Sequence, residues 1–364
     1  MGTELSEHLP KASLQFWPKH GVILDSPDIP HRTKKEAFIG YWVGAPTAVR
    51  WGERILLSHR IRAPRGSVDE NGKDMERGWT TVLSQSRDGF HFEEVGRLHK
   101  SVFSASSVEK CSALPMADGR WALYVSYASA REDETKGMWC IDRIVSSDLA
   151  GVFSPQQTPE TVLTPQRCPS LEGGWMVTGI KDPFFLADEE GSYFYDGSYH
   201  MVASFSKAAG DIEEDLHGEG DCYNSGLIRS CTAYFTSEDG LHFKWQGEIL
   251  APQEATWFAY ACRLTTAFQE EGGWWGVIDG ACSVAENYNE RSALVAGPSL
   301  QELKPVSGEG ATLCPAFDSE SPFGGEGGVR YVSAIRHLGR LLLYYEYTRY
   351  DGAHDLRVAE AELV

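Results

Sequence analysis

The sequence predicts an all-β fold, because three features recur along its 364 residues. Helical periodicity is nearly absent, and short runs of β-branched and aromatic residues are bounded by Gly, Pro and Asp. Related strand-turn-strand segments also return at intervals, as they do in repeat proteins. Hydrophobic residues make up 42% of the chain and aromatic residues 12%, so a protein of this size can bury a substantial core.

The strand-turn-strand unit occurs five times. In each copy, a first strand leads through a turn, usually marked by Gly, into a second strand rich in Leu, Trp or Tyr. The third copy runs from Gly179 through Asp182-Pro183 to a turn at Glu189-Glu190-Gly191, and its second strand is expected at 192–195. The five copies cover residues 44–60, 109–127, 179–195, 261–279 and 329–347.

A second motif, Ser-x-Asp-Gly-x-x-Phe, lies between the third and fourth strands of a unit. It occurs at 86–92 and 237–243, where Asp-Gly predicts a tight hairpin. An apolar tail follows in four units, but the fifth unit ends with the chain, so residues 13–25 are expected to supply its last strand. We therefore predict one domain over 1–364, a five-bladed β-propeller whose ring is closed by N- and C-terminal strands. Its blades are expected at about 41–100, 105–165, 175–251, 256–307 and 326–364 plus 13–25.

Two stretches interrupt the repeats. Residues 66–77 are polar and predict a loop within the first unit. Residues 208–225 are acidic, and long loops of this kind are either solvated connections or lids over a site.

The composition narrows the class of partner and the compartment. Asp and Glu outnumber Lys and Arg by 52 to 33, which argues against binding a nucleic-acid backbone. No basic, apolar leader opens the chain, and no apolar run is long enough to span a membrane. The eight cysteines are scattered, so we expect reduced thiols and a cytoplasmic location, with a Cys262–Cys282 disulfide as the alternative.

Charged residues are expected on the propeller axis, which the first strand of each blade lines. Counting back from each turn aligns Lys110, Asp182, Arg263 and Arg330, with Ala45 near the equivalent position of the first unit. Charge at four of five inner positions suggests a polar site, although a structural ion cluster would give the same pattern. Pro183 holds the backbone before it extended, so the Asp182 carboxylate is aimed rather than free to swing.

More polar residues fall near the ends of the second strands, at Arg60, Asp196, Asp279 and Glu346. The last of these leads into a turn rich in Arg, His and acidic residues, where an Arg fork could bind a carboxylate or a phosphate. We predict no metal site and no cofactor, and we expect His354 to form hydrogen bonds. The residues expected to bind substrate are Lys110, Lys181, Arg263, Arg330, Arg60, Asp279, Arg349, His354 and Arg357.

With these features the chain resembles the five-bladed β-propeller glycosidases, the superfamily of glycoside hydrolase families 43, 32, 68 and 130, as a divergent member. The resemblance is carried by Lys181-Asp182-Pro183, by Glu109 and by the Ser-x-Asp-Gly hairpins. It implies three carboxylates acting on a sugar, with Asp182 as base, nucleophile or positioning group and Glu109 as the acid. Such chemistry needs two carboxyl groups whose environments separate their pKa values.

The chain departs from this pattern in its first unit, where Ala45-Pro46 stands in place of the family's Asp-Pro. The missing carboxylate could be replaced by Asp279 or by Glu346, and we count Glu346 as a third catalytic candidate. The cationic inner positions suit an acidic or phosphorylated sugar, or phosphate as the attacking group. A different enzyme of small-metabolite biosynthesis and a non-catalytic sugar-binding propeller remain the alternatives.

Overall fold

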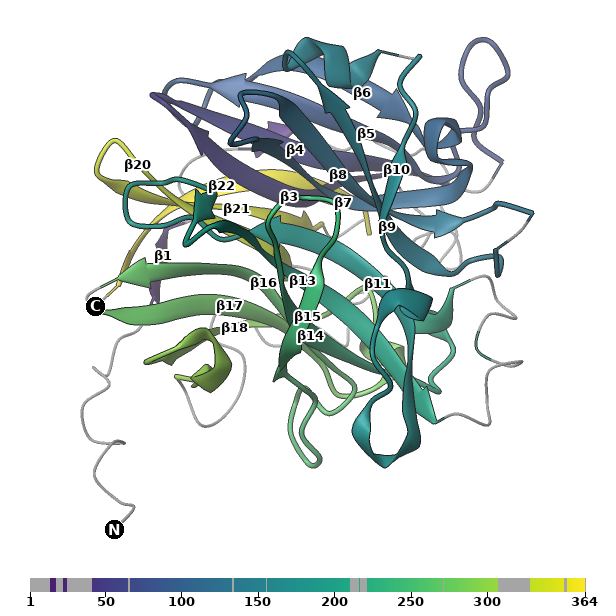
Figure 1. The fold of residues 1–364 in the computed structure, drawn as a ribbon, viewed down its shortest axis with the longest axis vertical. Helices are drawn as coiled ribbons and strands as arrows, with labels where there is room; N and C mark the ends of the chain where they lie inside the picture. The colour runs from purple at the N-terminus through teal and green to yellow at the C-terminus, as the bar shows by residue number, and fades with distance from the viewer. Residues whose placement is uncertain are drawn as a thin grey trace.

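The computed structural model describes residues 14–17, 22–24, 41–64, 66–132, 134–154, 156–209, 216, 221–270, 272–306, 328–349 and 352–363. These residues form strands joined by turns and short 3-10 helices, so the all-β prediction is confirmed (Figure 1). Among them, no helix is long and apolar enough to cross a membrane. The 3-10 helices are η1 (Lys100–Phe103), η2 (Ala150–Phe153), η3 (Pro165–Arg167), η4 (Glu172–Gly174), η5 (Cys222–Asn224), η6 (Val284–Glu286) and η7 (Leu300–Glu302).

The described strands form three sheets, two of which are each joined from two antiparallel groups by a single parallel pair, β22 with β3 and β14 with β16. We call the resulting five antiparallel groups blades 1 to 5. Blade 1 contains β3 (Trp42–Trp51), β4 (Arg54–Ala63), β5 (Arg77–Ser86) and β6 (Glu93–His99). Blade 2 contains β7 (Ala105–Pro115), β8 (Trp121–Ser129), β9 (Trp139–Ser146) and β10 (Glu160–Leu163). Blade 3 contains β11 (Trp175–Phe185), β12 (Phe194–Tyr195), β13 (Ser198–Ala209), β14 (Arg229–Ser237) and β15 (Lys244–Leu250).

The last two blades complete the ring. Blade 4 contains β16 (Ala261–Glu270), β17 (Gly273–Ala281), β18 (Arg291–Gly297) and β19 (Lys304–Pro305). Blade 5 contains β20 (Val329–His337), β21 (Arg340–Thr348) and β22 (His354–Leu363). Its outer position is filled by β1 (Leu14–Trp17) and β2 (Val22–Leu24), which both pair with β22.

The five first strands surround the axis. The strands β3, β7, β11, β16 and β20 pack each against the next, and β20 packs against β3 to close the circle. Figure 1 shows the yellow C-terminal strands beside the purple strands of blade 1, where His354 of β22 pairs with Trp42 of β3. The predicted closure by N- and C-terminal strands is therefore confirmed.

The inner edges of the first strands would leave backbone groups unpaired without a cap from a neighbour. Two hydroxyl side chains supply such caps across blade boundaries. The amide of Ala48 donates to Ser333 Oγ at 2.9 Å, and the amide of Ala334 donates to Thr266 Oγ1 at 3.1 Å. These bonds tie blade 5 to blades 1 and 4.

Both copies of the Ser-x-Asp-Gly motif form the expected hairpins, between β5 and β6 and between β14 and β15. Gly89 and Gly240 have φ of 83° and 70°, a conformation that favours glycine. Each turn also docks onto a neighbouring blade. Tyr344 donates to the Gly89 carbonyl at 2.8 Å, and Tyr124 donates to the Gly240 carbonyl at 2.7 Å.

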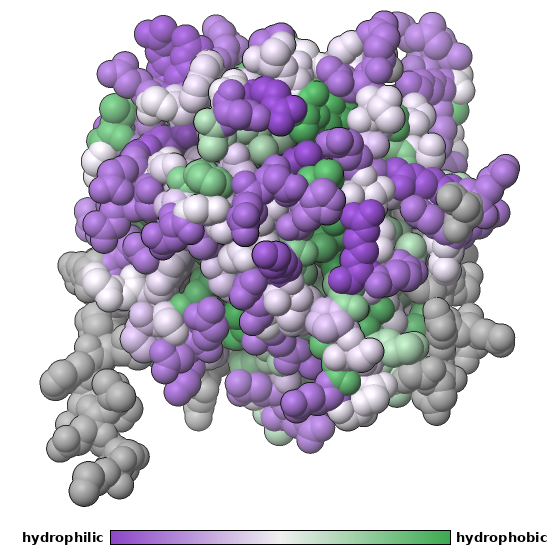
Figure 2. Space-filling model, in the orientation of Figure 1, coloured by the Kyte–Doolittle hydropathy of each residue, from purple (hydrophilic) through white to green (hydrophobic). Residues whose placement is uncertain are grey.

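Apolar side chains fill the spaces between blades. The largest cluster joins blades 1, 2 and 3 and includes Phe103, Tyr127, Phe205 and Phe235, all of which are buried. By contrast, the face in Figure 2 is mostly hydrophilic, with small scattered hydrophobic areas. The apolar residues therefore hold the blades together, and mostly hydrophilic residues cover this face.

Two expectations about local structure are wrong. Residues 192–195 are not the second strand of blade 3, because β11 pairs with β13, and β12 is a two-residue strand on the other end of β13. Asp196 therefore lies in the β12–β13 turn, with φ of 51°. The Cys262–Cys282 disulfide does not form, since both thiols are free.

The two predicted loops have different outcomes. Residues 66–76 connect β4 to β5 within blade 1, as expected. Most of the acidic stretch at 208–225 falls at 210–215 and 217–220, which lie outside the described residues.

Candidate active site

A β-bulge interrupts the first strand of every blade near the axis. In blade 3, Lys181 pairs with Ser204 and Phe184 pairs with Val202, so Asp182 and Pro183 together face one residue of β13. Such bulges re-aim side chains and are common beside active sites. The equivalent irregularities lie at 45–46 in blade 1, 109–110 in blade 2, 265 in blade 4 and 331–332 in blade 5.

The register makes Asp182 equivalent to Glu109, Ala45 and Tyr331, each the first bulged residue of its strand. Asp182, Ala45 and Tyr331 all have positive φ, at 60°, 51° and 54°. The extended backbone expected at Asp182, before Pro183, is therefore wrong, because the bulge places this residue in the left-handed region. Backbone in this region is strained for residues other than glycine, and such strain is concentrated at functional sites. The bulge thus aims two carboxylates, on neighbouring blades, toward the axis.

The predicted alignment of Asp182 with Lys110, Arg263 and Arg330 is wrong by one or more positions. Arg330 is equivalent to Lys181, and Lys110 follows the position of Asp182. In blade 4, Arg263 comes before the bulge and pairs with Asp279 of the second strand. In blade 5, Arg330 likewise comes before the bulge and pairs with Glu346 of the second strand. The error arises because the extra bulge residue shifts any count made from the turn.

Buried charges crowd the axis on the side where the first strands begin. Six cations and five carboxylates there are all at least nine-tenths buried. Burying so many charges is costly unless each is compensated or kept for a purpose. This central cluster comprises Arg60, Arg62, Lys110, Lys181, Arg263, Arg330, Glu109, Asp182, Asp279, Glu290 and Glu346.

Asp182 is the carboxylate with the fewest contacts in the cluster. It is 5% exposed, and neither of its oxygens has a hydrogen-bond partner among the described residues. Lys181 Nζ lies 3.5 Å from its Oδ2, and this ammonium also stacks over the rings of Tyr223 (4.6 Å) and Trp139 (5.0 Å). Since buried polar groups are nearly always satisfied, Asp182 is open to a ligand.

Glu109 is 6% exposed and pairs with the Arg60 guanidinium. Burial raises the pKa of Glu109, but the charges of Arg60, Lys181 and Arg62 outweigh it and hold the pKa below its usual range. In the free protein, Glu109 is therefore a carboxylate, and a proton-donor role requires a change that raises its pKa.

Glu346 is fully enclosed and is held from four sides. Its carboxylate accepts from the amide of Ala45 (3.0 Å) and from His354 Nδ1 (2.5 Å), and it pairs with Arg60 (3.2 Å) and Arg330 (3.1 Å). Burial opposes ionisation, but the two arginines and His354 hold the pKa of Glu346 far below its usual range. These contacts favour a structural role over the catalytic role expected for Glu346.

The glycine before Ala45 makes room for that carboxylate. A Cβ on Gly44 would lie 1.8 Å from Glu346 Oε2. The Glu346 side chain, which comes from blade 5, thus occupies the space beside Ala45 of blade 1. Ala45 is the position at which the resemblance led us to expect an Asp. His354, stacked on Trp42 at 4.3 Å, positions Glu346 from the other side.

Glu290, which the sequence analysis missed, completes a chain of ion pairs. It pairs with the Arg263 guanidinium and, at 2.5 Å, with Arg330 NH1. It follows β17 in a connecting segment, where no repeat marks its position. The chain runs through Arg263, Glu290, Arg330, Glu346, Arg60 and Glu109, from blade 4 across blades 5 and 1 to blade 2.

Asp279 and Lys110 are tied to the protein. Asp279 accepts from the Tyr331 amide at 2.6 Å and from Ser292 Oγ at 2.7 Å, and burial raises its pKa to about 6. Lys110 donates to the Thr265 carbonyl at 2.7 Å, and burial lowers its pKa to about 8. Both line a small axial cavity with Asp182.

Two of the expected substrate-binding residues form ion pairs outside this cluster. Arg349 and Arg357 both pair with Asp355, at 3.5 and 2.9 Å. Arg357 also stacks 3.7 Å from the Tyr347 ring. These contacts support a structural role for Arg349 and Arg357. His354, from the same turn, does reach the central cluster, and nothing in the sequence of the turn distinguishes it from the two arginines.

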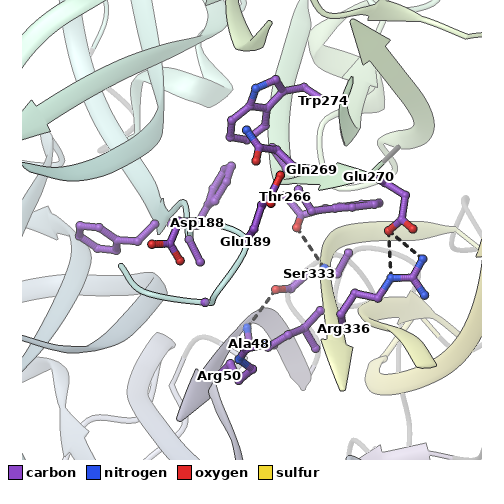
Figure 3. Close-up of a pocket in the computed structure, with 18 of the residues that line it drawn as sticks. Ala48, Arg50, Asp188, Glu189, Thr266, Gln269, Glu270, Trp274, Ser333 and Arg336 are labelled. Atoms are coloured by element: carbon purple, nitrogen blue, oxygen red, sulfur yellow. Dashed lines mark hydrogen bonds and ion pairs between the residues drawn. The ribbon is translucent and has the colours of Figure 1, made fainter. Parts of the chain in front are cut away.

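A wider cavity opens at the other end of the axis. It has a volume of about 520 Å³ and lies at the C-terminal ends of the first strands. Figure 3 shows Trp274 and Gln269 on one side and Asp188 and Glu189 on another, with Arg336 paired to Glu270. No carboxylate of the central cluster lines this cavity. The candidate active site is therefore the end of the axis that holds the central cluster.

Comparison with known proteins supports the fold. No family model and no curated protein matches the sequence. Among solved structures, one described as a glycoside hydrolase has a TM-score of 0.61 at 11% identity, covering 95% of this chain and 92% of that chain. A thermostable family-43 glycoside hydrolase has a TM-score of 0.54 at 12% identity, covering 89% and 94%.

A third similar structure belongs to a study of glycoside hydrolase family 130. It is described as showing that this family of mannoside phosphorylases contains glycoside hydrolases that target β-1,2 mannosidic linkages in Candida mannan. The TM-score is 0.58 at 12% identity, covering 95% of this chain and 93% of that chain. The expected resemblance is thus confirmed for the fold, while the reaction has to be argued from the site.

Proposed function

We propose that this protein is a glycoside hydrolase-like enzyme that cleaves a glycosidic bond on the charged side of the axis. The observation that carries the proposal is the equivalence of Glu109 and Asp182. Both are buried first-bulge residues of neighbouring blades, and Asp182 lacks a hydrogen-bond partner among the described residues. Paired carboxyl groups in different environments are what glycoside cleavage requires. The glycoside hydrolases among the structural neighbours add support.

In the proposed reaction, Glu109 protonates the oxygen of the leaving group while the bond to the anomeric carbon breaks. Asp182 stabilises the positive charge that develops on the sugar, and acts as base toward the attacking group or as nucleophile. Substrate binding further buries Glu109 and excludes water, which raises its pKa toward that of a general acid. An anionic substrate adds to this effect, because it offsets the nearby charges of Lys181 and Arg62.

The cations of the central cluster support an acidic or phosphorylated sugar as substrate. Arg62 and Lys181 have no short ion pair to an acid among the described residues, apart from Lys181 with Asp182 at 3.5 Å. A phosphate ion as the attacking group is equally compatible with such charges, and it would make the enzyme a phosphorylase. All seven described cysteines are free thiols, which supports the proposed cytoplasmic location.

An NMR turnover screen tests this function. Wild type, Asp182→Asn and Glu109→Gln are incubated with neutral and acidic glycosides and with phosphorylated sugars, each with and without added phosphate. We expect wild type to release a free sugar or a sugar phosphate and both variants to be inactive. Dependence on phosphate separates a phosphorylase from a hydrolase.

A different reaction on the same scaffold is the second candidate. It is favoured by Ala45, which replaces the expected first-blade Asp, and by the enclosure of Glu346. Silence of wild type across the whole panel would support this candidate. Binding of a sugar by wild type without any turnover would instead support a sugar-binding propeller.

A further inference from the structure

Arg62 differs from every other arginine of the central cluster. It lies on β4 two residues after Arg60 and is paired with Trp42 of β3. Side chains two residues apart on a strand lie on the same face of the sheet. Arg62 therefore lies on the same face as Arg60, nearer the start of β3. Its guanidinium stacks 4.5 Å from the Trp42 ring and 5.6 Å from the Tyr288 ring, and the residue is 8% exposed.

No acid among the described residues pairs with this guanidinium. The Arg62 side chain has no hydrogen bond and no ion pair to them, and its Nε is buried without a partner. By contrast, Arg60, Arg263 and Arg330 each pair with a glutamate. The pKa values agree with this difference, because burial lowers that of Arg62, while the paired glutamates raise that of Arg60 despite its burial.

We propose that Arg62 binds an oxyanion on the substrate, the carboxylate of an acidic sugar or a phosphate group. This inference rests on the proposed function, because it concerns the same site. An unpaired guanidinium that rests against the rings of Trp42 and Tyr288 is already ordered for a two-pronged bond to an oxyanion. Its charge also acts on Glu109, so the group it binds lies near the proposed acid.

The competing explanation is that Arg62 only packs on Trp42. Any long cation can lie over a ring, and an uncharged unbranched side chain can supply part of the contact. Arg62→Met keeps an unbranched apolar chain and removes the charge and the guanidinium, whereas Arg62→Lys keeps a charge without the fork. Arg54→Met is the matched control, because Arg54 stacks 5.9 Å from Trp51 at the far end of the same strand.

The test measures binding without turnover. The melting temperatures of wild type and the three variants are followed against sodium glucuronate, sodium galacturonate, inorganic phosphate, and glucose and galactose as neutral matches. We expect wild type to be stabilised by at least one oxyanion and not by its neutral match. We expect Arg62→Met to bind that anion at least about tenfold more weakly, Arg62→Lys to fall between, and Arg54→Met to match wild type.

Each outcome decides the inference. Stabilisation by a uronate indicates an acidic sugar, and stabilisation by phosphate alone indicates a phosphate group. The inference is overturned if no oxyanion stabilises wild type or if Arg62→Met responds as wild type does. Anion binding through Arg62 without turnover in the NMR screen would refute the proposed function alone. Turnover of neutral sugars that is unchanged in Arg62→Met would refute this inference alone.

Discussion

Replacing Gly44 by alanine should destabilise the protein strongly, although it adds a single methyl group. The new Cβ would lie 1.8 Å from Glu346 Oε2, 2.4 Å from Cδ and 2.5 Å from Cγ. Glu346 cannot swing aside freely, because Arg60, Arg330, His354 and a backbone amide hold it. Either the β3 backbone moves or the carboxylate leaves its two arginines.

The loss of stability can be estimated for the case in which the Glu346 carboxylate leaves Arg60 and Arg330. Breaking a buried ion pair and leaving its partner uncompensated costs about 3–5 kcal/mol. A change from glycine to alanine returns only about 0.4–1 kcal/mol through the unfolded chain. We therefore expect a net loss of roughly 2–4 kcal/mol, which is a large share of the stability of about 5–15 kcal/mol of a typical domain.

Urea unfolding of four proteins measures this coupling: wild type, Gly44→Ala, Glu346→Ala and the double variant. Gly44→Ala should cost little once the Glu346 carboxylate is gone, so the two losses should not add. Gly273→Ala is the control, because its Cβ would meet nothing closer than 3.5 Å. Additive losses, or a Gly44→Ala protein within about 0.5 kcal/mol of wild type, would refute the reasoning.

Three further outcomes are expected. Burial lowers the pKa of His59 from 6.5 to about 4. Above pH 6.5 the ring is neutral in both the folded and the unfolded state, and up to about 3 kcal/mol of stability is lost as pH falls from 6.5 to 4, because the unfolded state takes up the proton first; His59→Leu should flatten this loss in urea titrations. Tyr124→Phe and Tyr344→Phe each remove one bond to an Asp-Gly turn and should cost about 1 kcal/mol apiece by thermal unfolding. Glu290→Gln leaves the buried Arg263 without its acid and Arg330 with Glu346 alone, and it should cost about 3–5 kcal/mol by urea unfolding.

Each of these has a contradicting result. An unchanged acid limb in His59→Leu would mean that other groups control acid unfolding. A large difference between the two tyrosine variants would show that the two motif copies are not equivalent. A Glu290→Gln protein as stable as wild type would show that Arg263 and Arg330 do not depend on that carboxylate.

The repeats made the ring of strands predictable, because turn chemistry and strand composition are local properties of the sequence. The Ser-x-Asp-Gly turns at Gly89 and Gly240 and the charged Asp182 strand were therefore found correctly. Alignment within the first strands failed by a residue or more, since a bulge adds a residue without any fixed sequence signal. One clue was available: Tyr331 follows Arg330 as Asp182 follows Lys181.

Side-chain partnerships across blades could not be predicted. Glu346 and Gly44 are about three hundred positions apart, and only the closure of the ring brings them together. Glu290 lies in a connecting segment outside the repeat, and Arg62 looks like any alternate residue of a strand. What distinguishes Arg62 is the lack of a partner, which is a property of the folded protein.

Glu109 and Asp182 are the residues that we propose perform the chemistry, and kcat/KM on the substrate found by the NMR screen tests this proposal most directly. We expect Glu109→Gln and Asp182→Asn each to lower kcat/KM by about 10²–10⁴-fold while both remain folded at the assay temperature, although Glu109→Gln should melt below wild type because it weakens the pair with Arg60. Loss of activity in both variants with an intact fold is the predicted result. Turnover within a few-fold of wild type in either variant would contradict the account.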